Sequence, residues 1–215
     1  MMTTSNQAQS EQNSDTEITL NLLSAVEQNS THTQRSIAHE MGVALGLANA
    51  YIKRCVKKGW IKATQVPANR YAYYLTPTGF AEKSRLTSSY LSSSFDFFRS
   101  ARNQCSSMFA ACEANHWHRI TLAGASDLAE IAALCAHDYK IELIGVVDPK
   151  ATEPVFAGVR VANRLKDLGT VDAVLVTELN DSQQAFDTLV SLLPAERILT
   201  PSLLKISRTK PKLVE

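Results

Sequence analysis

The sequence of 215 residues has little of what marks a secreted, membrane-bound or metal-binding protein. Its four cysteines, Cys55, Cys105, Cys112 and Cys135, are widely spaced without a CxxC pair, which argues against a zinc site and a disulfide scaffold. No apolar run approaches the ~18 residues of a membrane span, and the polar N-terminus lacks the basic and apolar regions of a secretory signal. We therefore expect a cytoplasmic protein whose cysteines are small buried groups.

Patterns of common catalytic sites are also absent from the second half of the chain. It contains no GxSxG motif and no His, Cys or Ser arrangement with a supporting base at informative spacing. His116 and His118 flank Trp117, but local spacing offers no third ligand for a metal. We expect no catalytic residues, no metal site and no enzyme activity.

Positive charge is unevenly placed along the chain. The whole sequence carries 22 basic and 21 acidic side chains, a net charge of +1. Between Thr33 and Leu75, however, seven basic residues stand against one acidic residue, Glu40. Such a local excess is typical of a surface that binds phosphate backbones. The seven are Arg35, Lys53, Arg54, Lys57, Lys58, Lys62 and Arg70.

Residues 16–79 have the pattern of a winged helix-turn-helix. Apolar residues at helical spacing predict a helix over about 16–28 and a second one that begins after Thr33 as N-cap and stops at Gly42. A third helix is predicted over about 44–58. Its predicted buried side chains are Leu45, Ala48, Ile52, Cys55 and Val56.

Beyond the third helix the period changes to about 2, which predicts two short strands, WIKATQV and RYAYYL, joined by the turn PAN. In a winged module the third helix lies in the major groove and the hairpin straddles the backbone or minor groove. Asn49 is the candidate base reader, since its amide can bond adenine bidentately. Gly46 would let the backbone approach closely, whereas Lys53, Lys57 and Arg70 are candidate phosphate contacts. The predicted DNA-binding residues are Thr33, Gly46, Asn49, Ala50, Lys53, Arg54, Lys57, Asn69 and Arg70.

The same residues resemble a known family. The stretch from TQRSIAHEMG to VKKGWIK, followed by YAYYLTPTGFAEKSRLT, resembles the MarR-type winged-helix regulators associated with exopolysaccharide gene clusters, over about residues 18–95. The resemblance implies a bacterial transcriptional regulator of genes for surface polysaccharide or related sugar metabolism. The positions that carry it are Gly46, Asn49, Lys53, Gly59 and Trp60, with the segment YLTPTG.

A long helix is predicted over about 78–115, because neither glycine nor proline occurs from Phe80 to Leu122. At 1.5 Å per residue it would extend about 55 Å. Large residues recur along it at spacings of four and three, with Arg102 breaking the alternation, and we expect this stripe to form a coiled-coil-like dimer contact. The alternative is that the stripe packs against the second domain of its own chain. The stripe consists of Leu91, Phe95, Phe98, Cys105, Phe109 and Cys112.

Strands and helices alternate in the rest of the chain, as in a Rossmann-like domain. RITLA, a helix over about 128–137 and IELIGVV form a βαβ unit, which continues through FAGVRV, a short helix near Leu165, DAVLVT, a helix over about 181–193 and RILTP. We expect five parallel strands and an α/β class overall. The predicted divisions are a disordered tail (1–15), a winged helix-turn-helix (16–79), a connecting helix (80–117), a Rossmann-like parallel α/β domain (118–207) and a tail (208–215).

Ligands of such folds bind where the first strand meets the first helix, because free backbone N–H groups and the helix dipole attract phosphate there. Gly124 opens this turn, and Asp148 ends the second strand, where a carboxylate can accept from ribose hydroxyls. The dinucleotide fingerprint is incomplete, because Ser126 and Ala129 replace its later glycines. NAD(H), a nucleotide and a nucleotide sugar are the candidate ligands. The predicted ligand-binding residues are Gly124, Ala125, Ser126, Asp127 and Asp148.

The order of a winged helix and a Rossmann-like domain resembles the Rex redox-sensing repressors, in the segments GASDLA, VVDP, FAGVRV and DAVLVT. This resemblance implies a response to the balance of NADH and NAD. Two functions stay open at this point. One is a dimeric, DNA-binding transcriptional regulator whose second domain senses a nucleotide-like molecule. The other is a ligand-free module that tethers DNA to a protein partner.

Overall fold

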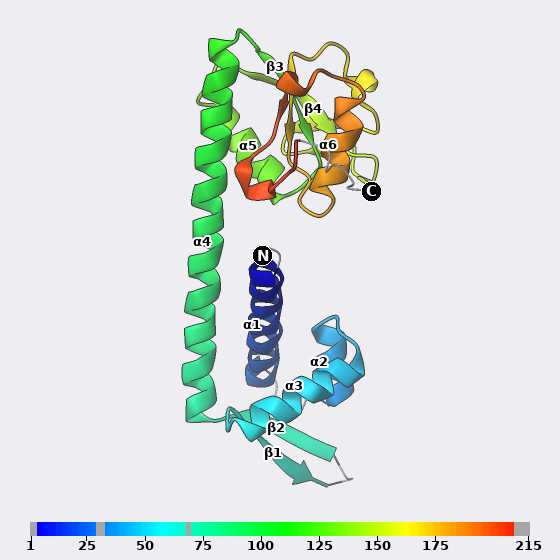
Figure 1. The fold of residues 1–215 in the computed structure, drawn as a ribbon. Helices are drawn as coiled ribbons and strands as arrows, with labels where there is room; N and C mark the ends of the chain where they lie inside the picture. The colour runs from blue at the N-terminus through cyan, green and yellow to red at the C-terminus, as the bar shows by residue number, and fades with distance from the viewer. Residues whose placement is uncertain (1–3, 29–32, 68–69, 209–215) are drawn as a thin grey trace, which may run out of the picture. The chain divides into compact units, whose positions relative to one another are not determined.

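A computed structural model describes the backbone of residues 4–28, 33–67 and 70–208, and the side chains of the same ranges except those of 4–14 and Arg70 (Figure 1). The chain divides into two compact units, residues 1–95 and 96–215. The first is a winged helix-turn-helix and the second an α/β domain built on a mostly parallel sheet, as predicted.

Three helices and a hairpin form the first unit, in the predicted order. They are α1 (Thr4–Gln28), α2 (Gln34–Glu40), α3 (Leu45–Lys57), β1 (Ile61–Val66) and β2 (Arg70–Leu75). The two strands pair antiparallel, with Ile61 opposite Leu75. Apolar side chains from every element meet in one core, which includes Leu22, Leu23, Val26, Ile37, Ile52, Cys55, Ile61, Tyr73 and Leu86.

The start of α1 differs from the prediction. Residues 4–15 are helical rather than a disordered tail, and residues 1–3 lie outside the described part of the chain. The prediction of disorder rested on polar composition, because a segment with few apolar residues has little surface to bury. The helix continues the amphipathic stretch that holds Leu22 and Val26 in the core, and Asp15 has its own contacts to α3.

A six-stranded sheet forms the second unit, in the spatial order β5-β6-β4-β3-β7-β8. Five strands run parallel, as predicted, and counted along the chain they follow the order 3-2-1-4-5 of a doubly wound sheet, which reverses between β3 and β7. The segment FAGVRV, predicted as one strand, forms two, because the chain turns back at Ala157 and Gly158, which both have positive φ. The strands are β3 (Arg119–Ala123), β4 (Glu142–Val147), β5 (Val155–Phe156), β6 (Val159–Ala162), β7 (Ala173–Val176) and β8 (Ile198–Leu199).

Helices cover both faces of this sheet (Figure 1). One face packs against α5 (Asp127–Ala136) and the C-terminal half of α4 (Pro77–Ala114), and the other against α6 (Ser182–Val190). Short 3₁₀ turns complete the connections, η1 (Leu165–Leu168), η2 (Ala195–Arg197) and η3 (Ser202–Leu204).

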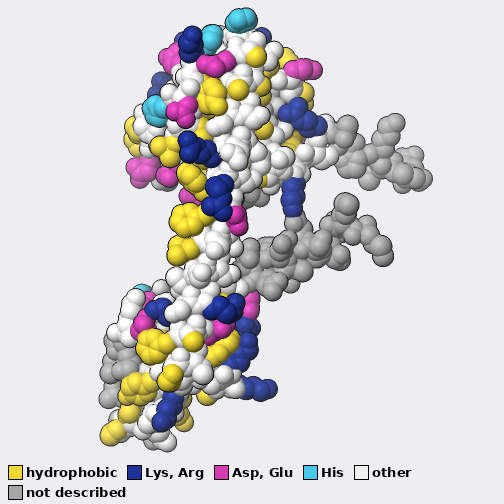
Figure 2. Space-filling view, turned by 90° about the vertical axis from the view of Figure 1, so that its left-hand side faces the viewer, with side chains coloured by type: hydrophobic (Ala, Val, Ile, Leu, Met, Phe, Trp, Pro, Cys, Tyr) yellow, Lys and Arg dark blue, Asp and Glu magenta, His cyan; other side chains and the backbone are white. Residues whose placement is uncertain are grey.

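The predicted stripe on α4 divides into two parts with different environments. Cys105, Phe109 and Cys112 are fully buried against the sheet and α5, so for them the alternative of packing against their own domain is correct. Leu91, Phe95 and Phe98 are exposed, as is every residue from 88 to 100. Figure 2 shows hydrophobic side chains at the surface of this helix.

All four cysteines are buried and free, as predicted from their spacing. Burial raises the pKa of the Cys55 and Cys112 thiols to about 11 and that of Cys105 to about 12. Because the thiolate is the reactive form, these groups are inert at neutral pH.

Arg208, the first residue of the predicted C-terminal tail, contacts the second unit. The Arg208 guanidinium donates to the carbonyl of Ile198 at 2.8 Å and to the Thr200 hydroxyl at 2.9 Å, so this residue belongs to the domain. Residues 209–215 lie outside the described part of the chain.

Candidate nucleic-acid interface

The turn between α2 and α3 is set by local sequence signals. Thr33 caps α2: its hydroxyl accepts from the Ser36 N–H at 3.1 Å, and the Ser36 hydroxyl accepts from the Thr33 N–H at 2.9 Å. Gly42 then takes a φ of +64°, which a side chain would disfavour. The predicted DNA-contacting residue Thr33 is exposed, but its hydroxyl is occupied by the cap.

One face of α3 is held in the core and the opposite face is open. Ala48, Ile52 and Cys55 are buried. Gly46, Ala50, Lys53 and Lys57, which are predicted DNA-binding residues, are exposed, and so is Leu47. Two predicted core residues lie outside the core, because Leu45 is 41% exposed and Val56 is 38% exposed.

The Asn49 amide is not open at both ends. The residue is half-buried, and its Oδ1 is buried with no donor among the described residues. A bidentate contact with adenine needs both ends of the amide at the surface. The structure therefore does not support the predicted role of Asn49 as base reader.

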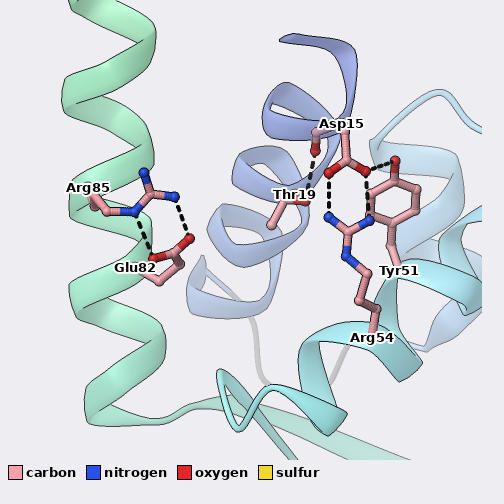
Figure 3. A network of polar contacts seen from close by, with 6 residues as sticks. All are labelled: Asp15, Thr19, Tyr51, Arg54, Glu82 and Arg85. Carbon is pink, nitrogen blue, oxygen red and sulfur yellow. Dashed lines mark hydrogen bonds and ion pairs between the residues drawn. The ribbon is translucent and has the colours of Figure 1, made fainter. Parts of the chain in front are cut away.

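Arg54 is held toward α1 by an acidic partner (Figure 3). Its two terminal nitrogens donate to the Asp15 carboxylate, one of them at 2.7 Å, and the Tyr51 hydroxyl donates to the same carboxylate at 2.6 Å. The Thr19 hydroxyl donates to the Asp15 carbonyl at 2.8 Å, one turn along α1. The predicted DNA contact of Arg54 is not supported, because this guanidinium is already paired in the folded protein.

The contact between Asp15 and Arg54 changes the protonation of both groups. Hydrogen bonds from Arg54, and then from Tyr51, hold the pKa of the Asp15 carboxyl below its usual value. The same hydrogen bond raises the pKa of Arg54. We call Asp15, Tyr51 and Arg54 the α1–α3 clamp, since they fix the rotation of α3 about its axis.

The hairpin is anchored by the segment TPTG at the start of α4. Thr76 and Thr78 both donate their hydroxyls to the carbonyl of Gly59, at 2.5 Å and 2.9 Å. A Cβ on Gly79 would lie 2.0 Å from the carbonyl oxygen of Trp60, so only glycine fits there. The segment YLTPTG, which carries part of the sequence resemblance, thus holds the start of α4 against Gly59 and Trp60.

Several cations surround the open face of α3. Among the residues that the structure describes, Lys53 and Lys57 form no ion pair, whereas Lys58 lies 4.3 Å from the centre of the Trp60 ring. Lys62 extends from β1 opposite Tyr74 and is exposed. Of the predicted wing residues, Asn69 lies outside the described residues, and Arg70 begins β2 with its side chain outside them. The remaining exposed cations can neutralise phosphates.

The turn after β3, predicted to hold a ligand, is closed by the chain itself. Gly124 has a φ of +106°, and a Cβ there would lie 2.6 Å from the backbone of Glu178. The glycine therefore permits the loop after β7 to approach, not a pyrophosphate. The Ser126 hydroxyl donates to the Thr177 carbonyl at 2.6 Å and caps the Ala129 N–H at 3.4 Å.

Asp148 serves the same loops. Its carboxylate accepts from the Ala125 N–H at 3.0 Å and from the Lys150 N–H at 2.8 Å, and the residue is 8% exposed. Each oxygen of this carboxylate thus has one N–H donor, and the contact of Asp148 with ribose hydroxyls stays a prediction. Asp127 is exposed at the first turn of α5, where its charge repels phosphate.

A cavity of about 210 Å³ nevertheless lies at the carboxyl ends of β3 and β4. Its wall is mostly apolar, and the Lys150 ammonium pairs with the Asp181 carboxylate at 2.6 Å beside it. Of the predicted ligand residues, Gly124 and Asp148 line it. Sequence spacing did not identify the rest of the wall, because six of its ten other residues come from α6 and the preceding loop. These ten are Ala123, Val147, Pro149, Lys150, Glu178, Asp181, Gln184, Ala185, Thr188 and Leu189.

No group of three or more His, Cys, Asp or Glu side chains in the described ranges is arranged to hold a metal ion. No helix within them is long and apolar enough to span a membrane.

Comparisons with known proteins bear mainly on the first unit. Residues 15–62 match the family model described as winged helix-turn-helix DNA-binding. These residues therefore form a winged helix-turn-helix DNA-binding domain, although the match covers less than half of the chain. No curated protein matches the sequence.

One solved structure similar to this chain is described as PigF with SAH. The identity is 11%, and the match covers 93% of this chain and 61% of that chain, with a TM-score of 0.25. This chain thus spans less than two thirds of the other chain's length. A TM-score of this size supports no statement about the present protein.

The α1–α3 clamp predicts a pH-dependent contribution to stability. Both side chains are about two-fifths exposed, so we expect Asp15→Asn to cost only about 1 kcal/mol or less at neutral pH. The folded pKa of Asp15 is lowered, so the contribution is complete above the unfolded value of about 3.9 and is lost as the pH falls through the folded pKa. Urea unfolding at pH 7 and in strong acid measures this difference. Asp96→Asn, at the exposed pair with Arg99, is the matched control; an equal cost of Asp15→Asn at both pH values would contradict the role of the clamp.

Proposed function

We propose that this protein is a transcriptional regulator that binds duplex DNA as a dimer, with α3 in the major groove and the β1–β2 hairpin beside it. The observation that carries the proposal is the open face of α3. Lys53 and Lys57 stand exposed on a helix whose other face is held in the core, within a segment that matches a DNA-binding family. The alternative of a solvated basic face is weaker, because the cations, the turn and the hairpin meet on one surface.

Phosphate contacts supply most of the affinity in this proposal. Each phosphate that a lysine neutralises releases a condensed counterion, so binding weakens linearly on a logarithmic salt scale. Lys53, Lys57 and Lys62 are exposed cations of the described interface. Arg54 is excluded from this set because it belongs to the α1–α3 clamp.

The exposed part of the α4 stripe supports dimerisation. Leu91, Phe95 and Phe98 lie at spacings of four and three on a helix section whose side chains are exposed in the described part of the chain. A second copy is the natural occupant, since a two-fold axis lets the same stripe meet itself and presents two α3 helices to two half-sites.

The cavity at the ends of β3 and β4 supports the binding of a small molecule by the second unit. Ligands of doubly wound sheets bind at this edge, where the strand order reverses. The closed turn at Gly124 favours a ligand whose ring enters the apolar cavity over one held by a pyrophosphate at the start of α5. A nucleotide or nucleotide sugar could place its ring in the cavity and leave its phosphate in solvent. NAD(H) fits less well, because its pyrophosphate would need the turn that Gly124 closes. Such a ligand would regulate DNA binding only if it preferred one arrangement of the protein.

We propose binding rather than catalysis as the role of this cavity. Its charged groups hold the surrounding loops: Asp148 accepts two N–H groups, Lys150 pairs with Asp181, and Glu178 accepts from the Asn180 N–H at 2.9 Å. A partner of duplex DNA would place the protein in the cytoplasm of a bacterial cell. The kinship with MarR-type regulators belongs to this proposal, and the second unit as a ligand-free tether for a protein partner is its alternative.

The phosphate contacts predict the effect of removing two lysines. We expect the double variant Lys53→Ala and Lys57→Ala to bind every duplex more weakly, with a salt slope reduced by about 0.9 for each lost contact. Fluorescence anisotropy over a range of salt concentrations measures this slope. Lys166→Ala, an exposed lysine of the second unit, should leave it unchanged; an unaltered slope in the double variant would remove these side chains from the interface.

The dimer contact predicts the effect of a charge in the stripe. Phe95→Asp places a carboxylate where two apolar surfaces meet, so we expect a monomer in sedimentation velocity experiments and weaker binding to duplexes with two half-sites. Leu192→Asp changes a residue of similar exposure away from α4 and should remain dimeric. A monomeric wild-type protein would contradict the proposal, as would a Phe95→Asp dimer of unchanged stability.

The cavity predicts thermal stabilisation by a nucleotide-like ligand. In a panel of NAD, NADH, nucleoside diphosphates and nucleotide sugars, we expect at least one compound at 100 times its Kd to stabilise the protein by about 2.7 kcal/mol. Ala185→Phe fills the cavity from α6 and should abolish the shift in melting temperature, whereas Val190→Phe, exposed on the same helix, should not. If no compound in the panel raises the melting temperature, the ligand-free tether becomes the better account.

A further inference from the structure

The part of α3 that would enter the groove first carries almost no hydrogen-bonding side chain. Its exposed residues from the N-terminal end are Leu45, Gly46, Leu47 and Ala50, and the cations begin one turn later at Lys53. Leu47 is 42% exposed, so the described residues leave much of a large apolar side chain open on this face of the helix.

The two leucines differ in their surroundings. Leu45 lines a shallow hollow with Tyr71 of β2, Gln34 and Arg35, so it lies toward the hairpin. Leu47 is not part of this hollow. It lies three residues from Ala50, and residues at this spacing are neighbours on a helix surface. Together Leu47 and Ala50 form a small apolar patch.

On α3 itself, the amide side chain able to form paired hydrogen bonds with a base belongs to Asn49, which is half-buried. Asn49 has its Oδ1 buried, with no donor among the described residues. At the first turns of α3, before Lys53, direct readout therefore favours a group that needs no hydrogen bond. In the major groove the C5-methyl group of thymine is the apolar group that a base pair presents.

From this geometry we infer that α3 reads thymine through its methyl group, with Leu47 and Ala50 as the contacting side chains. The inference rests on the proposed function, since it names what the DNA-binding face recognises. Gly46 assists this contact. The space beside its Cα is open, with nothing within 4 Å of where a Cβ would lie, so the helix backbone can approach the base edges there. The partner of this patch is duplex DNA rather than an apolar protein. Lys53 and Lys57 follow the patch within two turns of the helix, and their charges complement phosphates.

Replacing thymine by uracil tests this inference, because uracil forms the same base pair without the methyl group. Full-length protein selects tight duplexes from a random pool, and each selected duplex is made again with deoxyuridine in place of thymidine. We expect binding to weaken by about fourfold for each methyl group that the patch covers. Leu47→Ala should bind the thymine duplex more weakly and lose most of this preference.

Two variants serve as controls in the same experiment. Val56→Ala shortens another exposed apolar side chain of α3 and should keep the preference for thymine. Lys53→Ala should weaken both duplexes by the same factor, since it contacts phosphate. Melting temperatures near that of the wild type would show that each variant is folded.

Each outcome decides the inference. Equal binding of thymine and uracil duplexes would overturn it while leaving DNA binding intact. An unchanged affinity of Leu47→Ala for DNA would also overturn it and would assign the patch to a protein partner. If no duplex is retained even at low salt, the proposed function fails, and the inference fails with it.

Discussion

The α1–α3 clamp is the interaction on which the rest of the DNA-binding unit depends. Arg54 and Tyr51 both donate to Asp15, so the middle of α3 cannot rotate without breaking a paired, charge-assisted contact. Ile52 and Cys55 enter the core from the adjoining face. The clamp and the core together leave one face of α3 open. That face combines an apolar patch near its start with two lysines further along, which is the arrangement a duplex groove with phosphate walls can accept.

A common rule connects the two units. In each, the residue whose chemistry best fits a ligand is used by the fold itself. Arg54 is paired inside the first unit, and Asp148 accepts backbone N–H groups inside the second. Ser126 likewise closes its loop onto Thr177. The surfaces left for partners are simpler: exposed lysines and small apolar side chains on α3, and an apolar cavity beside α6.

Features that depend on neighbouring residues were predictable from the sequence. The Thr33 cap, the stop at Gly42 and the alternation of β1 and β2 follow local rules, and the parallel strands follow the repeated βαβ pattern. Contacts between distant residues were not predictable. Asp15 lies 39 positions from Arg54, in a polar segment with no local signal for its partner. The large residues of the α4 stripe have similar spacings in both halves of the helix, yet Phe109 is buried and Phe95 is exposed. Spacing alone does not predict which segment packs against a helix face.

Lysine acetylation read by mass spectrometry, with and without saturating duplex DNA, tests the central claim most directly. The claim is that the open face of α3 lies against duplex phosphates. It predicts that DNA protects Lys53 and Lys57 from acetylation, while the exposed Lys140 and Lys166 of the second unit react as before. Equal modification of Lys53 and Lys57 in the presence and absence of bound duplex would contradict it.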